Sequence, residues 1–303
     1  MQLQLAQRQK AKMRLSISAP TGFGKTYGAL LIAYGMTNDW SKIAVIDTEN
    51  RSASLYADLG QYYTIPIEPP FTTDKYIKAI ELCEQGGIEV VIIDSVTHVW
   101  KGEGGLLEHN NNLGGRYQDW AKTTPLYLKW LNKILHSSCH IIATMRKKQA
   151  YSMVQEGGKT KVEKKGMEDE IRDGFDYEMT VAFEIINDKH LCGTSKDRTR
   201  MFTGKPEFVI TSATGAMIAD WCESGVDIQS AITEAINNLK NVDTLEELKT
   251  FGETLPDYVT TDPVFRNAAI QKQGELKKKE KLAPPPAATN GTVKEDLFAD
   301  QQS

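Results

Sequence analysis

The stretch from Ser18 to Thr26, with the sequence SAPTGFGKT, restricts what this chain can fold into more than any other feature. It follows the short apolar run Leu15–Ile17 and precedes a helix-like segment, Tyr27–Met36. A glycine-containing turn between a strand and a helix directs several backbone N–H groups and the positive end of the helix dipole at one point. An anion is stabilised at such a point, so the stretch predicts a phosphate-binding loop in an α/β fold.

The residue types in this loop predict a nucleotide bound with a metal. In the P-loop pattern the glycines let the backbone approach phosphate, the lysine reaches the β- and γ-phosphates, and the next hydroxyl ligates Mg²⁺. Lys25 and Thr26 hold the last two positions, and Ala19 stands where the pattern has its first glycine, which a small residue at negative φ allows. We therefore expect ATP and Mg²⁺, with these nucleotide contacts: Pro20, Thr21, Gly22, Phe23, Gly24, Lys25 and Thr26.

Two other interpretations of the loop are weaker. A plain turn between strand and helix does not require the adjacent triplet Gly24-Lys25-Thr26. A dinucleotide site would use Gly22, Gly24 and Gly28 with Asp47 about twenty residues on, but the glycine spacing is off by one and Lys25 has no role in that pattern.

Composition limits the rest of the chain. With 303 residues and 40% hydrophobic residues, we expect one main domain and a small annex. A net charge of −4 argues against a protein that coats nucleic acid, so any such contact must be local. The polar segment Met1–Met13 and the short apolar runs predict neither signal peptide nor membrane span, and hence a cytoplasmic protein, in the bacterial host if phage-encoded. The four cysteines and five histidines lack zinc or disulfide spacing.

The run Ile88–Ser95 is the most hydrophobic strand candidate and has the form of a Walker B strand. It ends in Asp94, and an acid at the tip of a buried strand beside the P-loop can hold Mg²⁺. Asp94 could instead cap the following turn. We predict Asp94 and Thr26 as the metal ligands.

Further along, the chain predicts two mobile loops and another core strand. Residues about 101–116 are rich in glycine and asparagine and predict a mobile loop, followed by a helix over Tyr117–Leu135 that is interrupted at Pro125. The run His140–Thr144 predicts a core strand, and Thr144 at its tip is a candidate sensor of the γ-phosphate or simply the end of the strand. Residues 146–173 predict the second mobile loop.

This order of parts resembles the RecA-like ATPases. The stretch VIDTENRSASLYADLG, Val45–Gly60, is similar to the RecA-family segment that carries the catalytic glutamate, and VVIIDSV, Val90–Val96, looks like the family's Walker B. The resemblance spans about Met13–Glu207 and is closest to phage-type RecA-like proteins associated with single-strand annealing. It implies a mostly parallel central sheet flanked by helices and makes Glu49 the general base for the attacking water. A carboxylate two residues past a strand end, one strand over from the phosphates, also suits that task, although Glu49 could be an ordinary turn acid.

A local basic patch follows the core strand at the place of the second DNA-binding loop in the RecA family. Between residues 146 and 165 there are seven basic residues and two acidic ones. Lysines and arginines would neutralise phosphates and a tyrosine could stack on a base, although charged runs are commonly just solvated loops. The candidate contacts to single-stranded DNA are Arg146, Lys147, Lys148, Tyr151, Lys159, Lys161, Lys164 and Lys165.

A second cationic cluster predicts self-assembly. The segments Tyr177–Ile186 and His190–Gly193 predict a hairpin, and Lys196 and Arg198 follow it. By resemblance to the RecA family, these two cations would stabilise γ-phosphate charge on a neighbouring subunit, which implies a ring or filament. A charged surface turn is the equal alternative.

The C-terminal part separates from the ATPase core, which we expect over 1–225. Helical periodicity predicts a small annex over 226–282, and the proline-rich, acidic stretch 283–303 predicts a disordered tail. A single-strand-binding or other recombination protein is a possible partner.

The sequence as a whole predicts an enzyme that binds and hydrolyses ATP with Mg²⁺ and acts on single-stranded DNA in recombination or annealing. The first alternative is an ATP-dependent loader or switch that acts on a protein partner in DNA replication or repair. The second is a nucleotide kinase with the lysine-rich loop as its lid.

Overall fold

The computed structural model describes residues 6–156 and 159–282. The chain divides into two compact units, a larger one over Gln9–Val226 and a smaller one that contains Asp227 and the residues beyond it together with the N-terminal residues up to Arg8. The predicted disordered tail, 283–303, lies outside the described residues.

A nine-stranded sheet forms the centre of the larger unit. Its order is β3-β2-β4-β5-β1-β7-β8-β9, with β6 paired to β5 outside this path. The strands from β3 to β7 in this order run parallel, whereas β8, β9 and β6 are antiparallel to their partners. This arrangement confirms the predicted α/β class with a mostly parallel sheet. The strands are β1 (Arg14–Ala19), β2 (Ile43–Asp47), β3 (Tyr63–Pro66), β4 (Val90–Asp94), β5 (His140–Glu156), β6 (Lys159–Asp169), β7 (Val181–Ile185), β8 (Leu191–Asp197) and β9 (Phe208–Val209).

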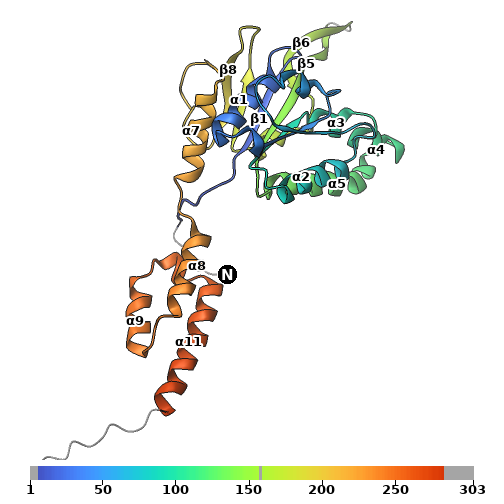
Figure 1. The fold of residues 1–303 in the computed structure, drawn as a ribbon. Helices are drawn as coiled ribbons and strands as arrows, with labels where there is room; N and C mark the ends of the chain where they lie inside the picture. Colours follow the sequence, from blue (N-terminus) through green and yellow to red (C-terminus); the bar gives the residue numbers. More distant parts are fainter. Residues whose placement is uncertain (1–5, 157–158, 283–303) are drawn as a thin grey trace, which may run out of the picture. The chain divides into compact units, whose positions relative to one another are not determined.

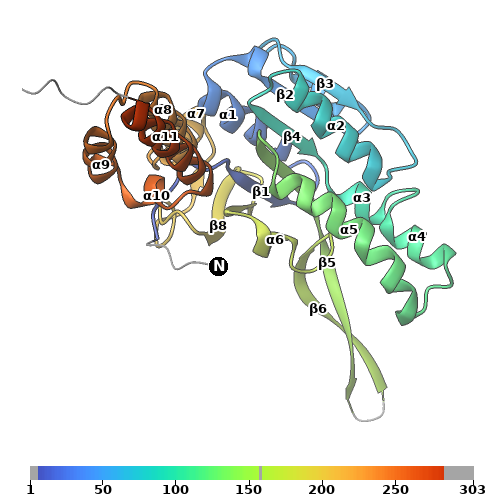
Figure 2. The same cartoon turned by 90° about the horizontal axis from the view of Figure 1, so that it is seen from below.

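Helices cover both faces of this sheet (Figures 1 and 2). Successive side chains of a strand point to opposite faces, so Val90 and Ile92 join one core while Val91 and Ile93 join the other. Both cores therefore need continuous apolar strands, and β4 is buried along its whole length. On one face lie α1 (Lys25–Thr37) and α7 (Ser212–Glu223), and on the other α2 (Thr73–Gln85), α3 (Thr97–Lys101), α4 (Leu106–Asn112) and α5 (Trp120–Leu135); α6 (Phe175–Glu178) precedes β7.

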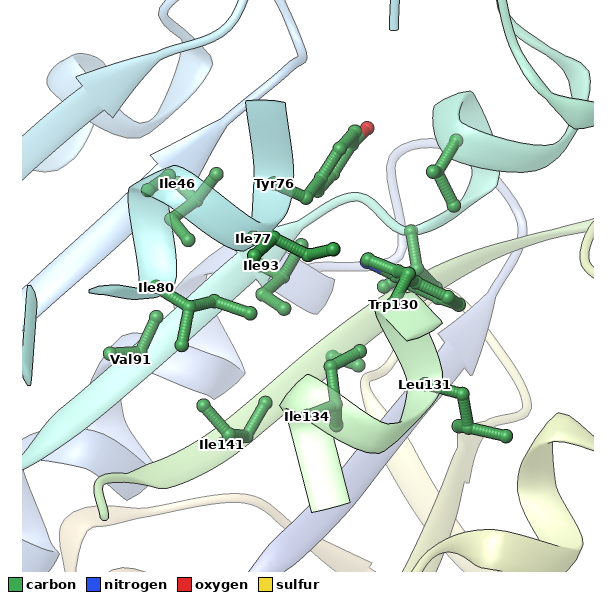
Figure 3. Close-up of a cluster of buried hydrophobic side chains, with 14 of the residues drawn as sticks. Ile46, Tyr76, Ile77, Ile80, Val91, Ile93, Trp130, Leu131, Ile134 and Ile141 are labelled. Carbon is green, nitrogen blue, oxygen red and sulfur yellow. The ribbon is translucent and has the colours of Figure 1, made fainter. Parts of the chain in front are cut away.

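The core on the second face is drawn in Figure 3. Tyr76 and Ile80 from α2 and Trp130 and Ile134 from α5 cover Ile93 of the sheet, and all five are fully buried. Each such side chain contributes about 1.5–3 kcal/mol of hydrophobic free energy when it is buried. This packing holds β4, and thus the acid at its end, in a fixed position.

The region 101–116 is not the predicted mobile loop. It contains the end of α3 and the whole of α4, followed by a 3-10 turn over Tyr117–Asp119. Leu106 and Asn110 of α4 are buried, and Thr123 donates a hydrogen bond to the Asn110 side chain at 3.2 Å. These contacts tie the segment to α5, which runs through Pro125 without the predicted interruption.

The region 146–173 also differs from its prediction. The core strand does not end at Thr144 but continues as β5 into a long hairpin with β6, which reaches away from the sheet (Figure 2). The register pairs Lys147 with Asp169 and Lys148 with Glu168. Opposite charges directly across an antiparallel pair stabilise the pairing of the two strands. A segment rich in charged residues can therefore form a hairpin as well as a solvated loop.

The smaller unit is helical. It contains α8 (Ile228–Leu239), α9 (Leu245–Thr254), α10 (Asp257–Thr260) and α11 (Pro263–Leu282). Ile232, Leu239, Val259 and Phe265 form its buried core. Among the described residues of both units, no helix has the length and apolar character needed to cross a membrane.

Candidate ATP-binding site

The predicted phosphate loop lies at the carboxyl end of β1, in the middle of the sheet, and leads into α1. Gly22 and Gly24 have φ values of 86° and 87°, in the left-handed region that favours glycine. Ala19 is the last residue of β1, so it has no need of glycine's freedom. The first turn of α1 has no side-chain cap. Its free N–H groups and the helix dipole are therefore directed at the loop, as an anion site requires.

Lys25 is the first residue of α1, and its ammonium turns back over the loop. Its Nζ donates to the carbonyl oxygens of Ala19 and Pro20, each at 3.0 Å. Burial lowers the pKa of Lys25, although the nearby carboxylates of Asp94 and Glu49 act in the opposite direction. A phosphate would give this partly desolvated cation a negatively charged partner in place of two carbonyl groups.

Asp94, at the end of β4, accepts two short hydrogen bonds from hydroxyl groups. Thr26 Oγ1 donates to its Oδ2 at 2.6 Å, and Thr144 Oγ1 donates to its Oδ1 at 2.5 Å. The side chain is buried, and that burial raises the pKa of Asp94 despite both hydrogen bonds. In the sheet, β5 lies between β4 and the P-loop strand β1, and Asp94 nevertheless contacts Thr26 of the P-loop. Thr144 meets Asp94 from β5, the strand that pairs with β4.

Glu49 lies just past the end of β2, in a turn that Asp47 holds. The Asp47 carboxylate accepts hydrogen bonds from the N–H groups of Glu49 and Ala53, both at 2.8 Å. The order β2-β4-β5-β1 puts two strands between β2 and the P-loop strand, so the predicted separation of one strand is wrong. Glu49 nevertheless reaches the same cavity as the loop.

Arg146 holds the Glu49 side chain. Its Nε donates to Glu49 Oε1 at 2.8 Å, its Nη2 donates to Oε2, and Ser95 Oγ donates to Oε1 at 2.9 Å. Burial alone would raise the pKa of Glu49, but these hydrogen bonds and the charge of Arg146 bring it below its ordinary value. The carboxylate is therefore ionised and paired. The sequence predicts Arg146 as a DNA contact, but its side chain lines the nucleotide cavity.

One cavity of about 520 Å³ joins these groups. That volume is within the usual range for small-molecule sites. Besides Lys25, Thr26, Glu49, Asp94 and Arg146, its lining includes residues that the sequence analysis did not single out: Ser52, Tyr56, Ile185, His190, Val209 and Ile210. His190 closes one side of the P-loop, since its Nδ1 lies 2.9 Å from the Phe23 carbonyl oxygen. No local pattern indicates His190, which comes from the turn between two antiparallel strands far along the chain.

A comparison with family models agrees with this geometry. The model described as an AAA domain matches residues 11–209. The chain belongs to the AAA domain family. These are P-loop ATPases, and nucleotide binding and ATPase activity follow in general from that membership. No curated protein matches the chain.

The residues of this AAA domain fit a nucleotide with Mg²⁺. The left-handed glycines and the uncapped helix start suit phosphate, Lys25 supplies a cation, and Thr26 with Asp94 supplies the hydroxyl and carboxylate oxygens that Mg²⁺ prefers. Bound Mg²⁺ would neutralise charge on the phosphates.

Lys196 and Arg198 are not brought to this cavity. Both donate to the carbonyl oxygen of Tyr177, Lys196 also donates to that of Asp176 at 3.1 Å, and Lys196 lies opposite Ala182 in the register. Ala182 is near the start of β7, whereas the cavity is lined by Ile185 at the end of β7. A role for Lys196 and Arg198 at a neighbouring subunit stays a prediction.

Apart from Arg146, the predicted DNA contacts separate into three groups. Lys147 is only 10% exposed in its side chain and pairs with Glu184 at 2.8 Å, so its charge is neutralised within the chain. Lys148 and Lys164 are exposed on the hairpin. The side chains of the remaining candidates lie outside the described residues: Tyr151, Lys159, Lys161 and Lys165.

Proposed function

We propose that this AAA domain hydrolyses ATP with Mg²⁺ and uses the reaction to act on single-stranded DNA in recombination or annealing, as an assembly of identical subunits. The observation that supports this best is the position of Arg146. This residue begins the hairpin that carries the exposed lysines, and it also holds the carboxylate of Glu49 in the nucleotide cavity. A ligand on the hairpin and the hydrolytic step therefore share one side chain.

In the proposed reaction each residue has a separate task. Lys25 and the N–H groups of the loop bind the phosphates and stabilise the charge that develops on the transferred group. Thr26 and Asp94 hold Mg²⁺, and Thr144 keeps the Asp94 carboxylate oriented. Glu49 orients the attacking water and accepts its proton, as general bases do.

Arg146 donates to both oxygens of Glu49, and this pairing lowers the pKa of the carboxylate and so makes it a weaker base for that water. The structure thus corresponds to a resting arrangement in the proposed cycle. Movement of the hairpin base would release the carboxylate, so DNA on the hairpin would stimulate hydrolysis. Lys196 and Arg198 would complete the site of the neighbouring subunit, which makes assembly a requirement for full activity.

The test is the rate of ATP hydrolysis at fixed protein concentration, measured alone, with a single-stranded oligonucleotide and with the matching duplex. We expect stimulation by the single strand and less by the duplex. Basal turnover that neither nucleic acid changes would contradict the DNA part of the proposal and favour a switch that acts on a protein partner. Transfer of phosphate to a nucleoside monophosphate would instead identify a kinase.

A further inference from the structure

A second cavity, of about 970 Å³, opens beside the base of the hairpin and shares no residue with the nucleotide cavity. Its walls come from the end of α3, the 3-10 turn before α5, the first turns of α5 and the segment that follows β6. We call this cavity the aromatic groove and define it by Trp100, Tyr117, Trp120, Ile171 and Arg172.

Flat surfaces dominate the aromatic groove. The rings of Trp100 and Trp120 stack at a centroid distance of 5.7 Å with 27° between their planes. The Arg172 guanidinium carbon lies 5.8 Å from the Trp120 ring centroid and 4.8 Å from that of Tyr127. Two indoles and a guanidinium are thus held in place around one open volume, and packing against α5 fixes them before any ligand arrives.

Tyr117 stands at the edge of the aromatic groove and is 92% exposed. Its backbone is fixed nonetheless, because it begins a 3-10 turn in which the Arg116 N–H donates to Asp119 Oδ2 at 2.9 Å. A large ring held on a fixed turn in water contributes little to folding. It does offer an apolar face, at low entropic cost, to whatever enters the groove.

The ligand chemistry that matches these surfaces is a nucleobase. Bases of single strands stack on aromatic side chains and on guanidinium planes, and each stacked base contributes about 1–3 kcal/mol. Exposed cations adjoin the ring-bearing positions in the chain and can meet the phosphates: Lys122, and Arg116, which also pairs with Asp119 at 3.7 Å. Asp173 also lines the groove and offsets part of this charge, so stacking should outweigh ionic contacts here.

The aromatic groove is also connected to the nucleotide site. Ile171 and Arg172 follow β6 after Glu170 alone, so a strand bound along the hairpin can continue into the groove. The helix α3, which supplies Trp100 to the other wall, also contains Thr97, and Thr97 accepts a hydrogen bond from the Arg146 N–H at 3.0 Å. A ligand that shifts α3 therefore acts on the residue that holds Glu49.

We propose that the aromatic groove stacks the bases of single-stranded nucleic acid. The proposal rests on the proposed function, because it adds a second, largely uncharged contact to the hairpin lysines. The two contacts differ in their salt dependence, since phosphate contacts weaken steeply with salt and stacking does not.

The experiment uses the full chain and a labelled oligothymidylate, with affinity measured by anisotropy at two salt concentrations and stacking measured by quenching of tryptophan fluorescence. Tyr117→Ala is the main variant, because a 92% exposed ring can be removed without disturbing the fold. Tyr63→Ala is the matched control, since Tyr63 is 59% exposed on the edge strand β3, outside the groove. Trp120→Phe keeps a ring but removes one indole signal.

We expect Tyr117→Ala to weaken binding about tenfold, within the range of one stacked base, with an unchanged salt slope. Tyr63→Ala should bind like the parent, and Trp120→Phe should lose much of the quenching. Equal binding by both tyrosine variants, without quenching in the parent, would overturn the aromatic groove as a binding site and leave the proposed function standing.

A parent protein that hydrolyses ATP but binds no oligothymidylate even at low salt would overturn both the groove and the DNA part of the proposed function. Quenching by a peptide that carries the chain's own Pro284-Pro285-Pro286 run, with none by the oligonucleotide, would overturn the groove proposal in favour of the tail as occupant.

Discussion

Replacing Arg146 with alanine tests whether the Glu49–Arg146 pair restrains hydrolysis. Two hydrogen bonds from the guanidinium hold the Glu49 carboxylate, and a hydrogen bond to a charged group contributes about 1.5–3 kcal/mol when buried. The Arg146 side chain is 36% exposed, and exposed ion pairs contribute at most about 1 kcal/mol. We therefore assign the pair about 1–2 kcal/mol. If hydrolysis requires its release, Arg146→Ala should raise basal turnover without DNA by about 5- to 30-fold.

The assay is steady-state phosphate release at saturating ATP with no nucleic acid present. Arg266→Ala, which removes an exposed arginine from the smaller unit, is the control and should leave the rate unchanged. In a Glu49→Gln background, Arg146→Ala should give no gain, because the carboxylate it would release is gone. A fall in basal turnover for the single variant would refute the reasoning and show that Arg146 assists the reaction, for example by contacting phosphate.

The remaining predictions concern the cavity and its surroundings. Lys25→Ala should abolish binding of a fluorescent ATP analogue, and retained affinity would contradict the phosphate loop. Thr144→Val removes a hydrogen bond to the buried Asp94, a loss of about 1.5 kcal/mol. The Mg²⁺ concentration for half-maximal turnover should therefore rise about tenfold. An unchanged Mg²⁺ requirement would show that Asp94 does not need this hydrogen bond. The fold lowers the pKa of Glu49, so its pairing stabilises the folded protein above about pH 4.3, and this stability is lost as the pH falls through the folded pKa. Thermal melts should therefore show a smaller drop in melting temperature on acidification for Glu49→Gln than for the parent. If Arg198 acts on a neighbouring subunit, mixed Glu49→Gln and Arg198→Ala proteins should recover turnover that neither has alone, and a mixture as inactive as its components would argue for action within one chain.

The sequence predicted the elements that depend on local signals. The loop around Lys25 has a motif that fixes strand, turn and helix together, and the apolar run that ends in Asp94 has only one reasonable interpretation as a buried strand. The helices of the smaller unit follow from periodicity and from caps such as Thr244, whose side chain accepts a hydrogen bond from the Glu247 N–H.

Features that depend on distant partners were beyond the sequence. Nothing local shows that Thr144 contacts Asp94, because that contact depends on the pairing of β5 with β4. The contact of Arg146 also has no local signal. The residues that follow Arg146 in the chain are lysines, whereas its partner in space, Glu49, lies 97 positions away. The sequence predicts a loop in place of this hairpin, because strands held by cross-strand charge pairs lack the alternation of apolar and polar residues that indicates a strand.

The single strand β5 belongs to both the core sheet, where it pairs with β1, and the hairpin, where it pairs with β6. The strand is 17 residues long, about 55 Å, and runs from the core into the hairpin, with an irregular register between Ala150 and Tyr151. The part of β5 that pairs with β1 ends at Arg146, opposite Ala19, and the far end at Glu156 lies about 33 Å beyond Arg146. Arg146 is therefore the last residue of β5 that the core sheet holds before the hairpin begins. The irregular register between Ala150 and Tyr151 is a point where the hairpin can bend, so it can take up movement of the far end before that movement reaches Arg146 and Glu49.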